Sequence, residues 1–321
     1  MGVFAKNKDF FGLDIGTTGI RVVKLGGDGA SRRLERYNST AVDPKLSLSQ
    51  APADQQKLAQ IIKKLVADTG LRSRGVVIGA PSKNVYASVI EIANLSAQEM
   101  KKSINYLAEQ YIPVSLDQVK LDWAQLGPAP DDPNKQEVLL VAARNNFTES
   151  RLSMLENIGL EVVGIQPDAL AMSRALVPAN GAEPIMILDL GASSSDLVII
   201  FNNAPRLIRS IPVGGEVFIK NIMQNLSVDI DQATQFLYKF GLDQTKLEGQ
   251  LYRSIQPNIQ ILVDEIKKSV QFFVGRYKGQ TIKLMVDTGN APSKQIATIL
   301  QQGWTEAGLK VEIVEFDVGT A

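Results

Sequence analysis

Hydrophobic residues near the start of the chain fall into short runs that glycine and proline separate. Such runs between chain breakers predict buried strands. The stretch 54–69 differs because its apolar residues recur every three or four positions, a spacing that predicts a helix ending at Gly70. The strands expected before residue 82 cover 10–15, 20–25, 33–42 and 76–80.

The stretch 82–162 carries its own alternation of strands and helices and is predicted to be an inserted subdomain. Its first helix opens with Ser96-Ala-Gln-Glu99, a capping box in which two side chains satisfy free amides of the first turn. The proline-rich stretch 127–136 predicts an exposed turn between two strands. The insert's strands are expected near 84–92, 118–127 and 137–143, and its helices near 97–110 and 147–158.

The second half of the chain starts with two strongly apolar runs and then becomes helical. Residues 185–190 and 197–201 predict two buried strands, and a largely helical stretch follows over 216–276. Within that stretch, apolar residues at spacings of three and four predict the buried face of a helix. These residues are Ile259, Leu262, Ile266, Val270 and Phe273. Residues 282–300 predict a further strand, turn and helix.

One motif occurs twice, each time after an apolar strand: Asp, an apolar residue, Gly and then small hydroxyl residues. The copies start at Asp14 and at Asp189. Glycine allows a tight turn whose amides point at a phosphate, and an Asp at the strand end can hold a hydrated Mg²⁺. Either copy alone could be a plain hairpin turn. Two copies favour two similar lobes that hold a nucleotide and its metal between facing hairpins.

The composition narrows the chemistry further. Cysteine and histidine are absent from the 321 residues, which excludes disulfides, Cys- and His-based metal sites and His-dependent triads. Formal net charge is zero, so nothing favours nucleic acid as a partner. No apolar run approaches the ~18 residues of a membrane span, and the N-terminus lacks the apolar core of a signal peptide. We therefore expect a soluble, cytosolic protein.

The opening FFGLDIGTTGIRVVKL resembles the first phosphate segment of the actin, Hsp70 and sugar-kinase superfamily. More closely, the chain is similar to the PilM family of type IV pilus assembly proteins, relatives of the cell-division protein FtsA. The other matching stretches are VGIQPDALAMSRAL at 163–176, the stretch 187–222 and VDEIKKSVQFF at 263–273. The resemblance implies an α/β, two-lobed actin-like ATPase fold with an inserted strand-helix-strand-strand subdomain of FtsA type.

The resemblance also implies a division of the chain and a set of nucleotide-binding residues. The first lobe would comprise 1–81 and 163–182, the insert 82–162, the second lobe 183–223 and 281–321, and a helical subdomain 224–280. The first phosphate loop would use Asp14, Gly16, Thr17, Thr18 and Arg21, and the second Asp189, Gly191, Ser193, Ser194 and Ser195. Asp14 and Asp189 would hold Mg²⁺ through water. Gly214, Gly215 and Glu216 match a turn at the ribose, and Glu265 and Lys268 match helix residues that reach ribose and base.

Several of these assignments have a plainer alternative. Arg21 could be a solvent-exposed strand residue, Asp196 could fit the second loop or simply brace its turn, and Glu265 with Lys268 could be solvated helix residues. The third nucleotide motif departs from the family, because relatives read Gly-Gly-Gly-Ala where this chain has Asp287-Thr288-Gly289-Asn290-Ala291. Gly289 and Asn290 are nevertheless expected at the adenine.

The resemblance implies a cytoplasmic scaffold at the inner face of the membrane that binds ATP or ADP with Mg²⁺. Its expected partner is the cytoplasmic N-terminal tail of a PilN-type membrane protein, which would bind near the cleft between the first lobe and the insert 82–162, with membrane contact only through partners. The resemblance leaves open whether the chain also binds pilus motor ATPases and whether it self-associates. An FtsA-like membrane anchor is the alternative, and a small-molecule kinase a weaker one. Because no residue stands out as a catalytic base, weak or absent ATPase activity is expected.

Overall fold

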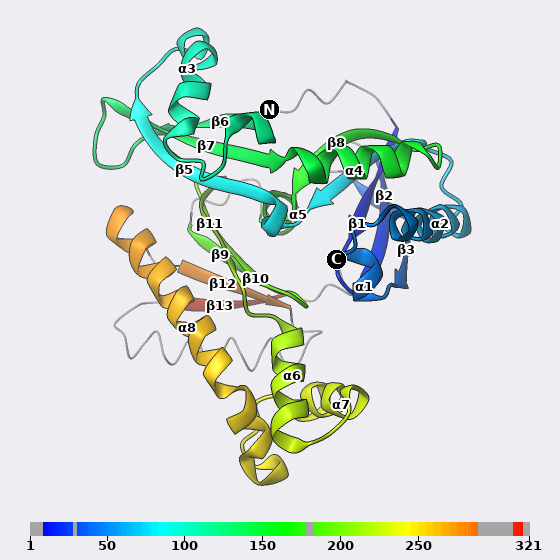
Figure 1. Cartoon of the computed structure of the whole chain (residues 1–321). Helices are drawn as coiled ribbons and strands as arrows, with labels where there is room; N and C mark the ends of the chain where they lie inside the picture. Colours follow the sequence, from blue (N-terminus) through cyan, green and yellow to red (C-terminus); the bar gives the residue numbers. More distant parts are fainter. Residues whose placement is uncertain (1–8, 28–30, 178–182, 281, 288–310, 317–321) are drawn as a thin grey trace. The chain divides into compact units, whose positions relative to one another are not determined.

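The computed structural model describes residues 9–27, 31–177, 183–280, 282–287 and 311–316, which form two compact units (Figure 1). The first unit comprises Met1–Gly127 and Asn134–Ala171. The second comprises Pro128–Pro133 and Met172–Ala321. Each unit is built around its own five-stranded sheet.

The first sheet has the order β3-β2-β1-β4-β8. Its strands are β1 (Phe10–Ile15), β2 (Gly19–Gly26), β3 (Arg33–Ala41), β4 (Gly75–Ala80) and β8 (Glu161–Pro167). The first three form an antiparallel meander, and β4 and β8 add in parallel. Alternate residues of β1 and β2 are buried, as expected of strands with one face on a core. Helix α2 (Pro52–Asp68) contributes Leu58 and Ile62 to that core.

Short helical elements follow several strands of the first unit. Helix α1 (Pro44–Ser47) follows β3, and α5 (Asp168–Leu176) follows β8. The 3₁₀ turns η2 (Ser82–Asn84) and η3 (Leu116–Gln118) lie within the insert.

The insert has a separate three-stranded sheet in the order β5-β7-β6. Its elements are β5 (Val85–Ala93), α3 (Ala97–Glu109), β6 (Val119–Pro128) and β7 (Lys135–Arg144). The predicted capping box is confirmed, since the Ser96 side chain accepts from the Glu99 amide and the Glu99 side chain accepts from the Ser96 amide. A core of its own lies between α3 and this sheet, and includes Met100, Ile104 and Leu140.

Helix α4 (Asn145–Glu156) follows β7 but packs elsewhere. Its buried Met154 and Leu155 belong to the core of the first sheet, together with Leu58 and Ile62 of α2. The self-contained core of the insert therefore consists of three strands and one helix. The second helix of the predicted insert shares the core of the first sheet.

The second unit repeats the first sheet's architecture in the order β11-β10-β9-β12-β13. Its strands are β9 (Ile185–Leu190), β10 (Ser195–Phe201), β11 (Ala204–Ile211), β12 (Ile282–Asp287) and β13 (Val311–Phe316). Here too the first three strands in this order pair antiparallel. Strand β12 pairs in parallel with β9, and β13 pairs in parallel with β12. Two sheets with one strand order confirm the duplication that the repeated motif predicts.

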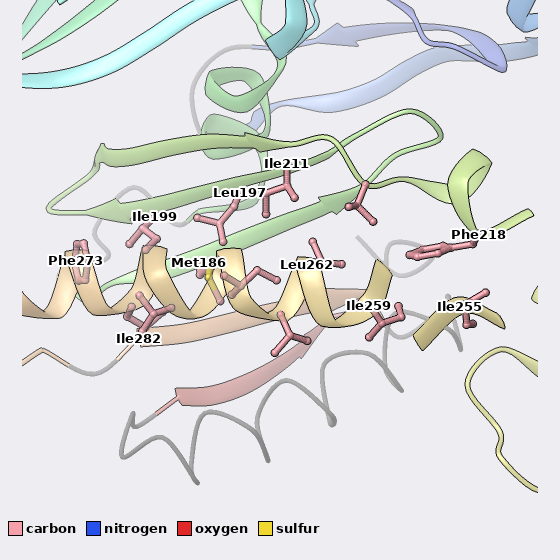
Figure 2. Packing of buried hydrophobic residues seen from close by; sticks show 14 of the residues in the cluster. Met186, Leu197, Ile199, Ile211, Phe218, Ile255, Ile259, Leu262, Phe273 and Ile282 are labelled. Atoms are coloured by element: carbon pink, nitrogen blue, oxygen red, sulfur yellow. The ribbon is translucent and has the colours of Figure 1, made fainter. Parts of the chain in front are cut away.

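Helices of the second unit supply a large apolar core (Figure 2). They are α6 (Gly215–Leu226), α7 (Ile230–Phe240) and α8 (Gln250–Arg276), with a 3₁₀ turn η4 (Lys246–Gly249) between the last two. All five residues of the predicted stripe on α8 are buried. Figure 2 shows α8 along the sheet, where Leu262 and Phe273 pack with Leu197 and Ile199 of β10.

Most of the predicted elements are confirmed, and β11 is one of the strands that the sequence analysis does not predict. Its hairpin with β10 closes through Asn202 and Asn203, whose φ angles are 52° and 58°. A two-residue turn with both φ angles positive is a type I′ turn, which Asn tolerates. The Asn-Asn pair after an apolar strand was therefore a usable hairpin signal. The helix expected after β12 lies outside the described residues.

Candidate functional site

The β1–β2 hairpin turns through Gly16-Thr17-Thr18-Gly19, where the Gly16 amide donates to the Gly19 carbonyl at 2.9 Å. The Thr18 carbonyl accepts from the Val42 amide at 3.0 Å. The Thr17 and Thr18 amides make no hydrogen bond with any described residue. Adjacent unengaged amides at a glycine turn form a concavity that suits an anion.

The predicted residues Asp14, Gly16 and Arg21 lie together at this turn. Asp14 and Arg21 are opposite in the strand register, and Arg21 Nη1 donates to Asp14 Oδ2 at 2.8 Å. A Cβ placed on Gly16 would lie 3.4 Å from that same Nη1, so the guanidinium borders the turn. Both side chains are about half exposed, at 59% and 47%. A cation therefore stands beside the unengaged amides, in keeping with a phosphate contact.

The β9–β10 hairpin repeats this geometry. The Gly191 amide donates to the Ser194 carbonyl at 3.0 Å, as Gly16 does to Gly19. Asp189 lies opposite Asp196, as Asp14 lies opposite Arg21. In the described part of the chain, the amides of Ala192 and Ser193 donate no hydrogen bond. The two predicted loops are thus equivalent in closure and register.

One difference between the hairpins concerns charge. The second hairpin places two carboxylates opposite each other, Asp189 exposed and Asp196 buried. Oδ1 of Asp196 is buried and has no hydrogen-bond partner among the described residues. A carboxylate oxygen without a donor is costly unless a cation or water reaches it. This donor set fits a hydrated Mg²⁺, which meets protein through few carboxylates.

The Gly214-Gly215 turn is fastened to the second hairpin through the backbone. The Gly215 amide donates to the Gly191 carbonyl at 3.0 Å, and the Glu216 amide to the Ala192 carbonyl at 2.9 Å. A Cβ on Gly214 would lie 2.5 Å from the Ala192 carbonyl oxygen, a distance that excludes any side chain there. The predicted Gly-Gly-Glu motif is therefore brought to the second loop, where α6 begins.

Ser195 is placed differently from Ser193 and Ser194. Its side chain is buried, and its hydroxyl donates to the Val213 carbonyl at 2.6 Å. That bond secures the chain just before Gly214. A direct phosphate contact of Ser195 stays a prediction, as do those of Ser193 and Ser194.

Glu265 and Lys268 of α8 form a charge cluster with Arg209 of β11. Lys268 Nζ donates to Glu265 Oε1 at 2.6 Å, and Arg209 Nη1 donates to Glu265 Oε2 at 3.3 Å. The hydrogen bond from Lys268 and the positive charges of both partners lower the pKa of Glu265. Arg209 was not singled out from the sequence, because its pairing with α8 depends on how helix and sheet pack. A role of Glu265 or Lys268 at the nucleotide stays a prediction.

The family is decided by comparison with known proteins. The family model described as type IV pilus assembly protein PilM matches residues 12–318. The chain belongs to the PilM family. A solved PilM-PilN type IV pilus biogenesis complex contains a chain with 25% sequence identity and a TM-score of 0.76, covering 96% of this chain and 88% of that one.

Two further proteins are similar to the PilM-family chain at lower sequence identity. The cell-division protein FtsA of Neisseria meningitidis serogroup B (strain ATCC BAA-335 / MC58) is 21% identical over 252 residues. The alignment covers 72% of this chain and spans 58% of the FtsA length. MreB 5 of Spiroplasma citri, solved bound to AMPPNP, matches with a TM-score of 0.53 at 13% identity, covering 95% and 90% of the two chains. The predicted actin-like ATPase fold is confirmed.

Two of the predicted nucleotide residues, Gly289 and Asn290, lie outside the described residues. Among the residues that are described, no group of three or more Asp, Glu, His or Cys could hold a metal ion.

Replacing Glu265 with Gln should lower thermal stability at pH 7 by less than about 1 kcal/mol, because the ion pairs are partly exposed. A lowered pKa in the folded state means that the stabilisation is present above the unfolded pKa and is lost as the pH falls. The difference between wild type and Glu265→Gln should therefore shrink below about pH 4.3. Thermal melts at several pH values measure this.

The neighbouring Asp264→Asn variant is the control for that measurement, since Asp264 is exposed and accepts from the uncharged side chain of Gln260. An equal loss of stability at pH 3 and pH 7 in Glu265→Gln would show that charge pairing contributes nothing.

Proposed function

We propose that this PilM-family chain binds ATP or ADP with Mg²⁺ through the two glycine hairpins and acts as a cytoplasmic scaffold of the type IV pilus inner-membrane complex. One observation carries the nucleotide part: two hairpins with the same closure, the same register and the same unengaged amide pair. A turn that served only to connect strands would need neither two unengaged amides nor a carboxylate at the same register position in both copies.

The residues of the first hairpin would act on phosphate. The Thr17 and Thr18 amides would donate to phosphate oxygens, and Arg21 would add a positive charge at the same turn. Since Arg21 is paired with Asp14, a bound phosphate would compete for the guanidinium and release the carboxylate. That carboxylate would then be available to water that surrounds a metal.

The second hairpin would act in the same way through the amides of Ala192 and Ser193. Asp189 and Asp196 would hold water molecules of a bound Mg²⁺, whose role is to neutralise phosphate charge. The second hairpin is held firmly to the Gly214-Gly215 turn by two backbone hydrogen bonds and by the buried hydroxyl of Ser195. The MreB 5 structure, which was solved with AMPPNP, has the same fold.

We expect Mg²⁺-dependent nucleotide binding with little turnover. The aspartates of the insert are Asp117, Asp122, Asp131 and Asp132, and none of them follows a phosphate hairpin. Isothermal titration with ATP and ADP, with and without Mg²⁺, measures binding, and a phosphate-release assay measures turnover. Absence of binding would contradict the nucleotide proposal. Release faster than ~1 s⁻¹, an ordinary enzymatic rate, would make the protein an ATPase.

The partner we propose is the cytoplasmic N-terminal tail of a PilN-type membrane protein. The support is that a similar chain was solved in a PilM-PilN complex. No helix in the described ranges has both the length and the apolar character needed to cross a membrane. We propose that attachment to the inner face of the membrane comes through this partner. Contacts with pilus motor ATPases and self-association stay predictions, and the FtsA-like alternative has the weaker support of 21% identity.

A further inference from the structure

The first hairpin is held from behind by a buried serine. The Ser47 hydroxyl, at the end of α1, donates to the Thr17 carbonyl at 2.6 Å. In a planar trans peptide the carbonyl and the next amide point in opposite directions. When the Ser47 hydroxyl holds the Thr17 carbonyl toward α1, the Thr18 amide therefore points away from α1. That amide is one of the two that make no hydrogen bond with a described residue.

A buried arginine in turn holds the residue that supplies this hydroxyl. Arg151 of α4 is 7% exposed, and its Nη2 donates to the Ser47 carbonyl at 3.4 Å. The Ser47 hydroxyl also lies 3.3 Å from the Pro44 carbonyl, within its own helix. The longer of its two contacts is thus local, and the shorter one reaches the hairpin.

Burial of the charged Arg151 side chain at this position costs free energy. Besides the Ser47 carbonyl, its contacts are the Met154 sulfur at 3.8 Å and the Phe147 ring, whose centroid lies 5.7 Å from Cζ. No carboxylate among the described residues forms an ion pair with it. Burial lowers the pKa of Arg151, yet a guanidinium keeps its charge in proteins. An apolar side chain would fill the same space at less cost, so packing alone does not account for an arginine here.

We propose that Ser47 and Arg151 are positioning residues of the first phosphate hairpin. Arg151 holds the end of α1, Ser47 holds the Thr17 carbonyl, and the Thr18 amide is thereby presented to an anion. This inference rests on the proposed nucleotide binding and adds two residues that belong to neither of the glycine motifs. Their sequence neighbourhoods carry no phosphate-binding pattern, and only the packing of α1 and α4 brings them to the turn.

The test of Ser47 uses a matched pair of hydroxyl deletions. Ser47→Ala should weaken Mg²⁺-ATP or Mg²⁺-ADP binding about three- to tenfold, the effect of one lost hydrogen bond. Thr69→Ala is the control, since Thr69 is also buried and donates its hydroxyl to a backbone carbonyl, that of Leu65, away from the hairpin. It should lower thermal stability but leave the nucleotide Kd unchanged. Equal Kd values for the two variants would overturn the role of Ser47.

The test of Arg151 separates positioning from stability. Arg151→Met keeps a long apolar side chain and removes the buried charge, so the melting temperature should stay equal or rise. Nucleotide binding should nevertheless weaken about threefold, because α1 is no longer held. A variant that is less stable but binds nucleotide as wild type does would show that Arg151 is structural only.

A measurement without nucleotide distinguishes failure of this proposal from failure of the proposed function. Backbone NMR order parameters at Thr17 and Thr18 should fall in Ser47→Ala and Arg151→Met, and stay at the wild-type value in Thr69→Ala. If wild type binds no nucleotide but these order parameters fall in the two variants, the nucleotide function is wrong and the positioning role of Ser47 and Arg151 is confirmed. If the order parameters do not change, the positioning role of Ser47 and Arg151 is wrong, whatever the protein binds.

Discussion

A chain in which a short Gly-Ser linker replaces residues 82–144 should bind a PilN-type tail at least about a hundredfold more weakly, because we propose that the insert supplies the surface to which the tail binds. Two or three anchor residues in fitted pockets account for a loss of that size. Nucleotide affinity should stay within about threefold, because both glycine hairpins lie outside the deletion. The insert predicted from sequence ran to residue 162, but α4 must be kept, since Met154 and Leu155 fill the core of the first sheet.

A pull-down with the soluble tail and a titration with Mg²⁺-ADP measure the two properties. A matched pair of core substitutions gives a milder test: Ile104→Ala loosens the insert core, and Ile62→Ala loosens the core of the first sheet. Each deletes a buried isoleucine and should cost about 2–5 kcal/mol. Only Ile104→Ala should weaken tail capture. A folded deletion variant that still captures the tail at full affinity would place the partner elsewhere.

Asp14→Ala and Asp189→Ala should each weaken Mg²⁺-nucleotide binding by about tenfold or more, and the double variant should lose the dependence on Mg²⁺. Each substitution removes a carboxylate that would hold a water of the hydrated metal. Folding should be preserved, because Asp14 and Arg21 are about half exposed and an exposed ion pair contributes ~1 kcal/mol at most. Asp189 is exposed as well.

Asp9→Ala is the control for these variants. Asp9, which directly precedes β1, forms an ion pair with Lys24 of β2, at the end of the hairpin away from the turn. Its removal should change neither affinity nor the dependence on Mg²⁺. The readouts are titrations over a range of Mg²⁺ concentrations and the thermal shift that nucleotide produces. If the shift is the same in wild type, Asp14→Ala and Asp189→Ala, the two hairpins do not hold a metal-nucleotide complex.

Local chemistry made much of the fold predictable. Glycine turns between apolar runs located the hairpins of β1–β2 and β9–β10, and the spacing of apolar residues located α2 and α8. The capping box located the start of α3. These signals act within a few residues, so a single sequence contains them in full. The motif repeated at Asp14 and Asp189 even predicted the duplication, which the strand order of the two sheets confirms.

Strands without a local signal were harder to foresee. Strand β8 pairs with β4 in parallel across the whole insert, and β13 pairs with β12. Parallel strands are joined by long connections, so no pattern in the neighbouring residues predicts which strands pair. The helix α4 is a related case, because its apolar residues are visible in the sequence while the core that receives them is not.

Sequence alone thus determined which residues make the turns, the strands and the repeated loops, because those depend on local conformation and on hydrophobic spacing. Tertiary structure alone decided what stands around each turn. It set Arg21 beside Asp14, Asp196 opposite Asp189, and Gly214 against the Ala192 carbonyl. It also brought Ser47 and Arg151 behind Thr17 from distant parts of the chain. The two pairs at Asp14 and Asp189 follow from the register of each hairpin, whereas the contacts of Gly214, Ser47 and Arg151 depend on packing between segments far apart in sequence, which no local pattern specifies.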